Sequence, residues 1–442
     1  MKIILSIITI EDVIKHVRSI SFPEEAKKLN TKNSKQQFAA SQKYIPGGIN
    51  GFKGPMHFVF GEYPIFLSHG LGSHVWDIDD NEYIDFMAAY GPVSIGYNEP
   101  EIDDAVINKI KSGFSFNLPQ IEQNQLAEEL TKIIPSAQQV LFAKTGTDAV
   151  NISIKLARAY TGKNRVLTDG YHGWCDFSMY DEDSGVLKSV SQHTSKIEYG
   201  DYESFEREAK KGDVAAILLT PYYHETYSSV YIDIEFIKKI RELSSSLDIP
   251  LIFDEVRTGF RVSLGGAQEQ IGIVPDLSTF SKAIANGYAI SAVTGGKKYM
   301  MPAYTPLPKG TFTCSTSFLN SLEITAAIKT IEFYKKYDVQ SELNKKGFFF
   351  MEEIDSIIKK YKIPLLNNGI PTMPSLVFDI DNMGEEKFKQ CTVIFYTYLI
   401  RCGIFMSPTH QSYIMYRHDE KDIYKALEVI EKAVHLIKSK VL

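Results

Sequence analysis

The chain has 442 residues, and its 48 Lys and Arg side chains against 54 Asp and Glu give a net charge of −6 with His neutral. A hydrophobic fraction of 44% and a charged fraction of 23% are ordinary for a globular protein, and the weakly acidic balance excludes the basic surface that binds DNA or RNA. The four cysteines form no CxxC pair and have no His at zinc spacing, so we expect reduced thiols, a cytoplasmic protein and no metal site.

The first segment, Met1–Ile10, is apolar but short. A membrane span needs about 20 apolar residues, and a secretory signal carries a small-residue cleavage site, whereas Glu11 and Asp12 follow this segment directly. We therefore expect a strand or an arm that packs on the body of the protein or on a partner subunit.

Residues 57–90 alternate short apolar runs with turn-forming residues. The stretch DIDDNEYID, residues 77–85, is typical of a hairpin with Asp79-Asp80-Asn81 in its turn.

From about residue 100, short apolar runs alternate with helical patterns. A helix is predicted over Thr147–Tyr160, because Val150, Ile154 and Ala157 recur at helical spacing. The predicted strands cover residues 140–142, 165–168, 215–219 and 250–253. This alternation predicts an α/β fold in which helices cover a mostly parallel sheet.

After Ile324 the character of the chain changes. A long helix through about Tyr334 leads into amphipathic helices and short strands, which indicate a smaller α+β domain. We therefore predict an N-terminal segment over residues 1–85 that is an arm and part of the small domain, a large domain over 86–335, and a C-terminal small domain over 336–442.

Ligands of an open parallel sheet bind at the carboxyl ends of its strands, and four motifs fall at such places. Thr145-Gly146-Thr147 stands between a predicted strand and a predicted helix, where backbone N–H groups and the helix dipole favour an anion. The same residues also fit a plain N-cap turn with Thr147 as the cap.

Gly170-Tyr171-His172-Gly173 follows the strand at 165–168, so its aromatic ring either stacks on a planar ligand or covers the core.

The other two motifs carry charge. Asp254 ends an apolar strand, so its carboxylate needs a cationic partner, either a protonated pyridine nitrogen or an arginine such as Arg257 or Arg261. Lys282 follows another apolar strand and precedes small residues, which is unusual for a surface lysine and suits an imine-forming nucleophile. Together the four motifs offer an anion cup, a stacking ring, a carboxylate and a lysine, which is the set that holds pyridoxal phosphate.

These residues resemble the class III aminotransferases, which belong to the fold type I group of pyridoxal-phosphate enzymes, and are most similar to the glutamate-1-semialdehyde 2,1-aminomutases. The resemblance covers roughly residues 44–435 and continues through Ser315-Thr316 and Ala326-Ala327. The matching stretches are IPGG (45–48), DIDDNEYID (77–85), YGP (90–92), TGTDAV (145–150), GYHG (170–173), FDEVRTGFR (253–261) and PDLSTFSKAIANG (275–287).

The resemblance implies a role for each motif. Lys282 would form the imine with pyridoxal phosphate, and Asp254 would pair with the pyridine nitrogen. Tyr171 would stack on one face of the ring, and Val256 would pack on the other. Thr145, Gly146 and Thr147 would bind the phosphate, and Thr316 would reach the phosphate held by the neighbouring subunit. The other implied cofactor contacts are His172, beside Tyr171, and Glu225, in the stretch that faces the 3-hydroxyl of the cofactor. The resemblance therefore implies a homodimer with shared sites and no role for nucleic acid or membrane.

The chain departs from the aminomutases around the substrate. They carry an Arg for the substrate carboxylate after the Pro-Gly-Gly turn, where this chain has Asn50-Gly51-Phe52-Lys53, and His410 aligns with their pocket Glu. A pocket that reads a polar group rejects analogues lacking it by up to roughly 10⁴–10⁵-fold, so these changes argue against the aminomutase reaction. The substrate contacts that we expect are Lys53, Tyr90, His410 and Arg417.

We therefore expect a ping-pong aminotransferase that moves an amino group from an amino acid such as L-glutamate to a small hydroxylated or phosphorylated ketone or aldehyde. Dihydroxyacetone phosphate or a keto-sugar would suit a pocket rich in Tyr, His and Lys. The alternative is an intramolecular aminomutase, which would convert one substrate without a co-substrate. A decarboxylase or racemase, and a non-catalytic binding protein, fit the motifs less well.

Overall fold

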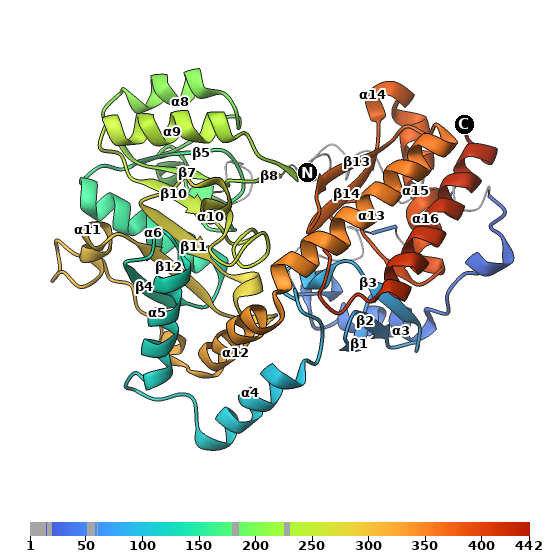
Figure 1. Ribbon diagram of the computed structural model, residues 1–442, viewed down its shortest axis with the longest axis horizontal. Helices are drawn as coiled ribbons and strands as arrows, with labels where there is room; N and C mark the ends of the chain where they lie inside the picture. Colours follow the sequence, from blue (N-terminus) through green and yellow to red (C-terminus); the bar gives the residue numbers. More distant parts are fainter. Residues whose placement is uncertain (1–14, 16–19, 51–57, 60, 179–184, 225–229) are drawn as a thin grey trace. The chain divides into compact units, whose positions relative to one another are not determined.

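The computed structural model describes residues 15, 20–50, 58–59, 61–178, 185–224 and 230–442 (Figure 1). The chain forms two compact units. The central unit contains residues 100–223 and 232–340, and the terminal unit contains the chain up to residue 99 together with residues 224–231 and 341–442. No helix among the described residues is long and apolar enough to cross a membrane.

The central unit is built on a seven-stranded sheet with the order β4-β12-β11-β10-β7-β5-β6. Strand β12 runs antiparallel to both of its neighbours, and the other strands are parallel, which confirms the mostly parallel α/β sheet. The strands are β4 Gln139–Ala143, β5 Arg165–Thr168, β6 Thr194–Lys196, β7 Val214–Leu219, β10 Leu251–Asp254, β11 Leu277–Phe280 and β12 Ser291–Gly295.

Helices cover both faces of this sheet. Strand β7 is buried at every residue, and its alternate side chains serve two separate cores. Ala216 and Leu218 pack in the core that contains the inner face of α6, whereas Ile217 and Leu219 pack in the core that contains α8 and α9. A strand buried on both faces reads as one continuous apolar run, which is why residues 215–219 were recognisable as a strand.

The helices of the central unit precede, connect and follow these strands. They are α4 Pro100–Ser112, α5 Ile121–Ile133, α6 Gly146–Thr161, α7 Lys188–Ser191, α8 Tyr202–Ala209, α9 Ile234–Ser246, α10 Ala267–Ile271, α11 Lys297–Met300 and α12 Leu322–Tyr337. Short 3-10 turns complete the unit at η5 Asp176–Ser178, η7 Lys282–Ala285, η8 Met301–Ala303 and η9 Thr316–Leu319.

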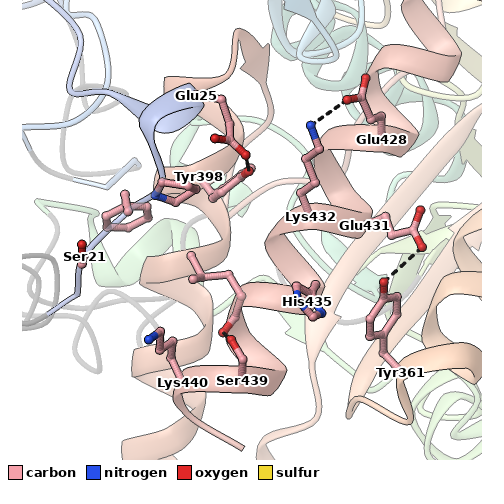
Figure 2. A pocket seen from close by; sticks show the side chains of 13 residues that line it. Ser21, Glu25, Tyr361, Tyr398, Glu428, Glu431, Lys432, His435, Ser439 and Lys440 are labelled. Atoms are coloured by element: carbon pink, nitrogen blue, oxygen red, sulfur yellow. Dashed lines mark hydrogen bonds and ion pairs between the residues drawn. The ribbon is translucent and has the colours of Figure 1, made fainter.

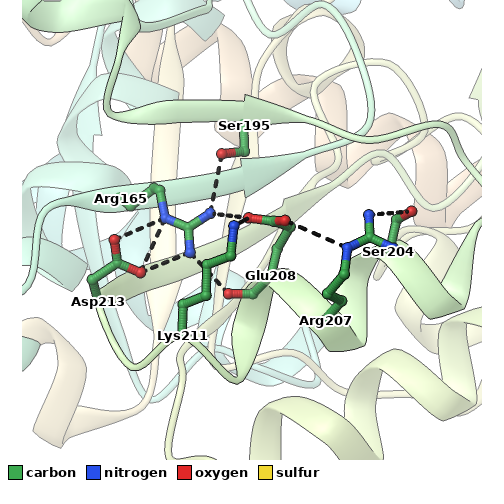
Figure 3. Close-up of polar contacts among 7 residues, drawn as sticks. All are labelled: Arg165, Ser195, Ser204, Arg207, Glu208, Lys211 and Asp213. Carbon is green, nitrogen blue, oxygen red and sulfur yellow. Dashed lines mark hydrogen bonds and ion pairs between the residues drawn. The ribbon is translucent and has the colours of Figure 1, made fainter.

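An ion-pair network fastens one edge of the sheet. Arg165, the first residue of β5, donates to both carboxylate oxygens of Asp213 at 2.7–3.0 Å and to Glu208, at the end of α8, at 2.7 Å (Figure 3). The same guanidinium donates to Ser195 of β6 at 3.2 Å. One buried side chain thus joins β5 to β6, to α8 and to the turn before β7.

The terminal unit holds a small sheet of order β1-β2-β3-β15, with β1 Leu67–Leu71, β2 His74–Asp77, β3 Glu82–Asp85 and β15 Ile404–Phe405. Strands β2 and β3 are antiparallel neighbours, which confirms the predicted hairpin. Its other elements are the hairpin β13 Leu365–Ile370 and β14 Met373–Phe378, the helices α3 Lys32–Ser41, α13 Val339–Tyr361 (of which residues 341–361 lie in this unit), α14 Ile380–Met383, α15 Glu385–Arg401 and α16 Glu420–Lys440, and the turns η1 Glu24–Ala26, η2 Pro46–Gly48 and η4 Ala88–Tyr90. A further short pair joins β8 Tyr223–His224 to β9 Val230–Tyr231.

Candidate active site

The carboxyl ends of neighbouring strands bring the charged motifs together. Asp254 is the last residue of β10 and lies opposite Thr279 of β11, the strand that Lys282 follows. The Oδ1 atom of Asp254 accepts the backbone N–H of Val256 at 3.1 Å and the hydroxyl of Thr279 at 3.4 Å. Its Oδ2 atom accepts a hydrogen bond from Nδ1 of His172 at 2.7 Å, so His172 is a cationic partner of Asp254.

His172 stands between two carboxylates. Its Nε2 atom lies 3.1 Å from Oδ1 of Asp169, and both Asp169 oxygens accept the backbone N–H of Thr220 at 3.3 Å. The sequence reading did not select Asp169, although it follows strand β5 directly and so carries the same strand-end signal that selected Asp254. Asp169, His172 and Asp254 are all buried.

His172 and Asp254 hold each other charged. Burial alone lowers the pKa of His172, but its hydrogen bonds to Asp169 and Asp254 outweigh burial and raise that pKa to about 9. Burial alone raises the pKa of Asp254, but His172, the Val256 N–H and the charge of Lys282 hold it below its ordinary value. At neutral pH the strand ends therefore present an ionised carboxylate that can receive a cationic ring nitrogen.

The start of α6 has the N–H groups that can bind an anion. Thr145, not Thr147, is the N-cap, because its hydroxyl accepts the Asp148 N–H while the Asp148 carboxylate accepts the Thr145 N–H in a closed capping box. The N–H groups of Gly146 and Thr147 come next in a first turn, where a helix has no acceptor of its own. Only glycine fits at 146, since a Cβ there would lie 2.8 and 3.0 Å from the two methyl groups of Val256.

Two further groups flank the carboxylate. The side chain of Tyr171 is 63% exposed, and its pKa is raised by partial burial and by the charge of Asp254. Lys282 opens η7 with a φ of 48°, a strained conformation of the kind that concentrates at functional sites. These residues fit pyridoxal phosphate: a first helical turn for the phosphate, an ionised carboxylate for the ring nitrogen, an open aromatic face and a lysine.

Comparison with known proteins agrees with this geometry. The family model described as Aminotransferase class-III matches residues 60–433. The chain belongs to the class III aminotransferases. It is a pyridoxal-phosphate-dependent aminotransferase of the fold type I architecture.

Relatives of this aminotransferase match along nearly their whole length. The chain is 42% identical to a 3-aminobutyryl-CoA aminotransferase of Cloacimonas acidaminovorans (strain Evry) over 417 residues, which cover 93% of the chain and 99% of the relative. It is 32% identical to a glutamate-1-semialdehyde 2,1-aminomutase of Fusobacterium nucleatum subsp. nucleatum, over 92% of the chain and 99% of the relative. Among solved structures, the internal aldimine form of the FumI protein of Sphingopyxis sp. MTA144 superposes with a TM-score of 0.84 at 27% identity, covering 91% of this chain and 96% of that one.

The other predicted contacts are Lys53, Tyr90, Glu225, Thr316, His410 and Arg417. Lys53 and Glu225 lie outside the described residues. Thr316 is exposed in η9 of the central unit. In the terminal unit of the aminotransferase, the rings of Tyr90 and His410 meet edge to face with centroids 5.1 Å apart. There Arg417 forms an ion pair of 2.6 Å with a carboxylate, that of Glu99.

The terminal unit also contains a pocket of about 510 Å³ beside α16 that lacks this chemistry (Figure 2). In this pocket Lys432 forms an ion pair with Glu428 at 2.8 Å, and the hydroxyl of Tyr361 donates a hydrogen bond to Glu431 at 3.2 Å. No residue that we expected at the active site lines this pocket. The candidate site of the aminotransferase is therefore the strand-end cluster of the central unit.

Proposed function

We propose that this aminotransferase takes the 3-amino group of a short 3-aminoacyl-CoA thioester, such as 3-aminobutyryl-CoA, and transfers it to a 2-oxo acid. With 2-oxoglutarate as the acceptor, the products are the 3-oxoacyl-CoA and L-glutamate. The amino group and one hydrogen leave carbon 3 of the thioester, and the oxo oxygen of the acid takes their place there, so the exchange balances without an oxidant.

The observation that carries this proposal is the 42% identity to the 3-aminobutyryl-CoA aminotransferase along its full length, against 32% for the aminomutase relative. The sequence around the Pro-Gly-Gly turn supports it as well. A thioester has no free carboxylate, so it does not need the carboxylate-binding Arg that Asn50-Gly51-Phe52-Lys53 replaces. The comparisons give no support to the hydroxylated or phosphorylated carbonyl acceptor that we expected from the sequence.

The strand-end residues account for the chemistry. Pyridoxal phosphate supplies an aldehyde for the amino group and an electron-withdrawing ring. We propose that Gly146 and Thr147 bind its phosphate through their N–H groups and that Asp254 holds its ring nitrogen. The Nζ amine of Lys282 would take the proton from carbon 3 of the substrate, acting as general base from the end of β11.

We propose substrate contacts outside the central unit as well. Lys53, Tyr90 and His410 are proposed substrate contacts. The guanidinium of Arg417 already uses Nε and Nη2 on Glu99, which favours a structural role for it over a substrate contact.

We also propose that the aminotransferase is a homodimer. The central unit exposes apolar side chains on α4 and the segment after it, which an aqueous surface does not favour. These are Ile107, Ile110, Phe116, Leu118 and Ile121, each 47–69% exposed. Light scattering on the protein as it leaves a size-exclusion column measures the mass of the assembly, which should be twice that of one chain. If Thr316 completes the partner's phosphate site, co-expressed Lys282→Ala and Thr316→Ala chains should regain activity that neither variant has alone.

The decisive experiment is a product assay on the purified chain. Incubation with 3-aminobutyryl-CoA and 2-oxoglutarate should yield L-glutamate and the 3-oxoacyl-CoA in equal amounts, and omission of 2-oxoglutarate should stop turnover after one equivalent. Lys282→Ala is the control for chemistry in solution. Turnover of glutamate-1-semialdehyde without any co-substrate, with none of the thioester, would overturn the proposal in favour of the aminomutase.

A further inference from the structure

Two buried carboxylates flank one imidazole ring in the central unit. Oδ2 of Asp254 lies 2.7 Å from Nδ1 of His172, and Oδ1 of Asp169 lies 3.1 Å from Nε2 of the same ring. A neutral imidazole carries one N–H, so it could satisfy only one of the two carboxylates and would turn a lone pair towards the other. With both carboxylates ionised, both contacts are favourable only when the ring carries both protons.

The charges of the neighbouring groups also favour a doubly protonated His172. His172 is fully enclosed, so an imidazolium there needs anions to replace water. With Asp254 as its only neighbour, the ring could hand over its proton and leave a neutral pair. Asp169 adds a second buried carboxylate, and its own position is set by the Thr220 N–H at the end of β7.

The consequence concerns the basicity of Asp254. A carboxylate that accepts a short hydrogen bond from a cation is a weaker base than one that faces a neutral ring. Asp254 and the ring nitrogen that it is proposed to hold compete for a single proton. A weaker base at Asp254 leaves that proton on the ring nitrogen, where it withdraws electrons from the substrate.

We infer that Asp169 is a positioning residue of this aminotransferase: it keeps His172 doubly protonated, and through His172 it keeps Asp254 oriented and weakly basic towards the ring nitrogen of the cofactor. Asp169 acts through two other side chains, across the carboxyl ends of β5, β7 and β10. The inference rests on the proposed role of Asp254 but not on the identity of the substrate.

The test reads protons by nitrogen NMR on the full chain loaded with pyridoxal phosphate. One sample carries ¹⁵N-histidine, assigned with His172→Gln, and a second carries pyridoxal phosphate labelled at its ring nitrogen. In the wild type at about pH 8, we expect both nitrogens of His172 to be protonated. In Asp169→Asn, which keeps the size of the side chain but removes its charge, one of them should lose its proton, and the ring-nitrogen signal should move towards that of neutral pyridine.

Asp276→Asn is the matched control, because Asp276 is a carboxylate of the same unit that accepts a backbone N–H and pairs with Arg241. It should leave both signals unchanged. If Asp169→Asn does not fold, the wild-type spectrum still decides: a singly protonated His172 at about pH 8 overturns the inference. An imidazolium that persists in Asp169→Asn also overturns it.

These outcomes separate the inference from the proposed function. A neutral ring nitrogen in the wild type would remove the role of Asp254 and the inference with it. Failure of the thioester assay would overturn the proposed substrate, but it would not alter any result expected from the NMR experiment.

Discussion

Gly146→Ala tests whether the start of α6 is the phosphate site. An alanine Cβ would lie 2.8 and 3.0 Å from the methyl groups of Val256, whereas carbon atoms rest at about 3.5–4.0 Å. Rotation of the stiff, β-branched Val256 side chain would not relieve this clash, because both of its methyl groups are too close to the new Cβ. The first turn of α6 would therefore move by roughly 0.7 Å. A hydrogen bond of about 2.9 Å stretched by that distance is largely lost.

The expected magnitude follows from that displacement. Loss of one charge-assisted hydrogen bond to the phosphate costs about 1.5–3 kcal/mol, so the Kd of pyridoxal phosphate should rise roughly 10- to 100-fold. Overpacking of about 1–3 kcal/mol is partly offset by the higher helix propensity of alanine, so the free energy of unfolding should fall by about 0–2 kcal/mol.

The assay titrates the cofactor-free chain with pyridoxal phosphate by absorbance and melts both proteins in parallel. Gly170→Ala is the matched control, since a Cβ at that position meets nothing within 4 Å and lies beside the same site. It should bind pyridoxal phosphate like the wild type. Wild-type affinity in Gly146→Ala would refute the assignment of the phosphate to this helix.

Three further predictions concern chemistry, stability and pH. Lys282→Ala should lower the rate of amino transfer by roughly 10³-fold or more with an unchanged melting temperature, and undiminished turnover would place the nucleophile elsewhere. Arg165→Met should lower the free energy of unfolding by about 1–2 kcal/mol in urea titrations, because it removes the buried guanidinium that joins Ser195, Glu208 and Asp213, while Lys211 still pairs with Glu208 at 2.6 Å. An unchanged midpoint would contradict the importance of the network (Figure 3). The folded pKa of His172, about 9, lies above its ordinary value of 6.5, so its charge stabilises the fold fully below about pH 6.5 and progressively less up to about pH 9. The stability difference between wild type and His172→Gln should therefore shrink across that range, from a limit of roughly 3 kcal/mol, and a difference independent of pH would show that His172 is neutral.

The sequence alone determined the elements and the separate motifs of this aminotransferase. Strand β7 is a continuous apolar run, and α6 has apolar residues at helical spacing, because each pattern is set by neighbours along the chain. Asp254 and Lys282 were recognisable because a charged residue directly after a buried strand is costly without a partner. The hairpin of β2 and β3 was readable from its turn residues for the same local reason.

Only the tertiary structure decided which motifs touch. Asp169 and Asp254 end β5 and β10, and they share His172 because β7 stands between those two strands, an order that no local pattern encodes. The seating of Gly146 on Val256 joins positions far apart in the sequence, so its demand for glycine is invisible in the TGT motif itself. Local periodicity follows from the geometry of one segment. These contacts depend instead on the order of the strands in the sheet and on the packing of the helices against both of its faces.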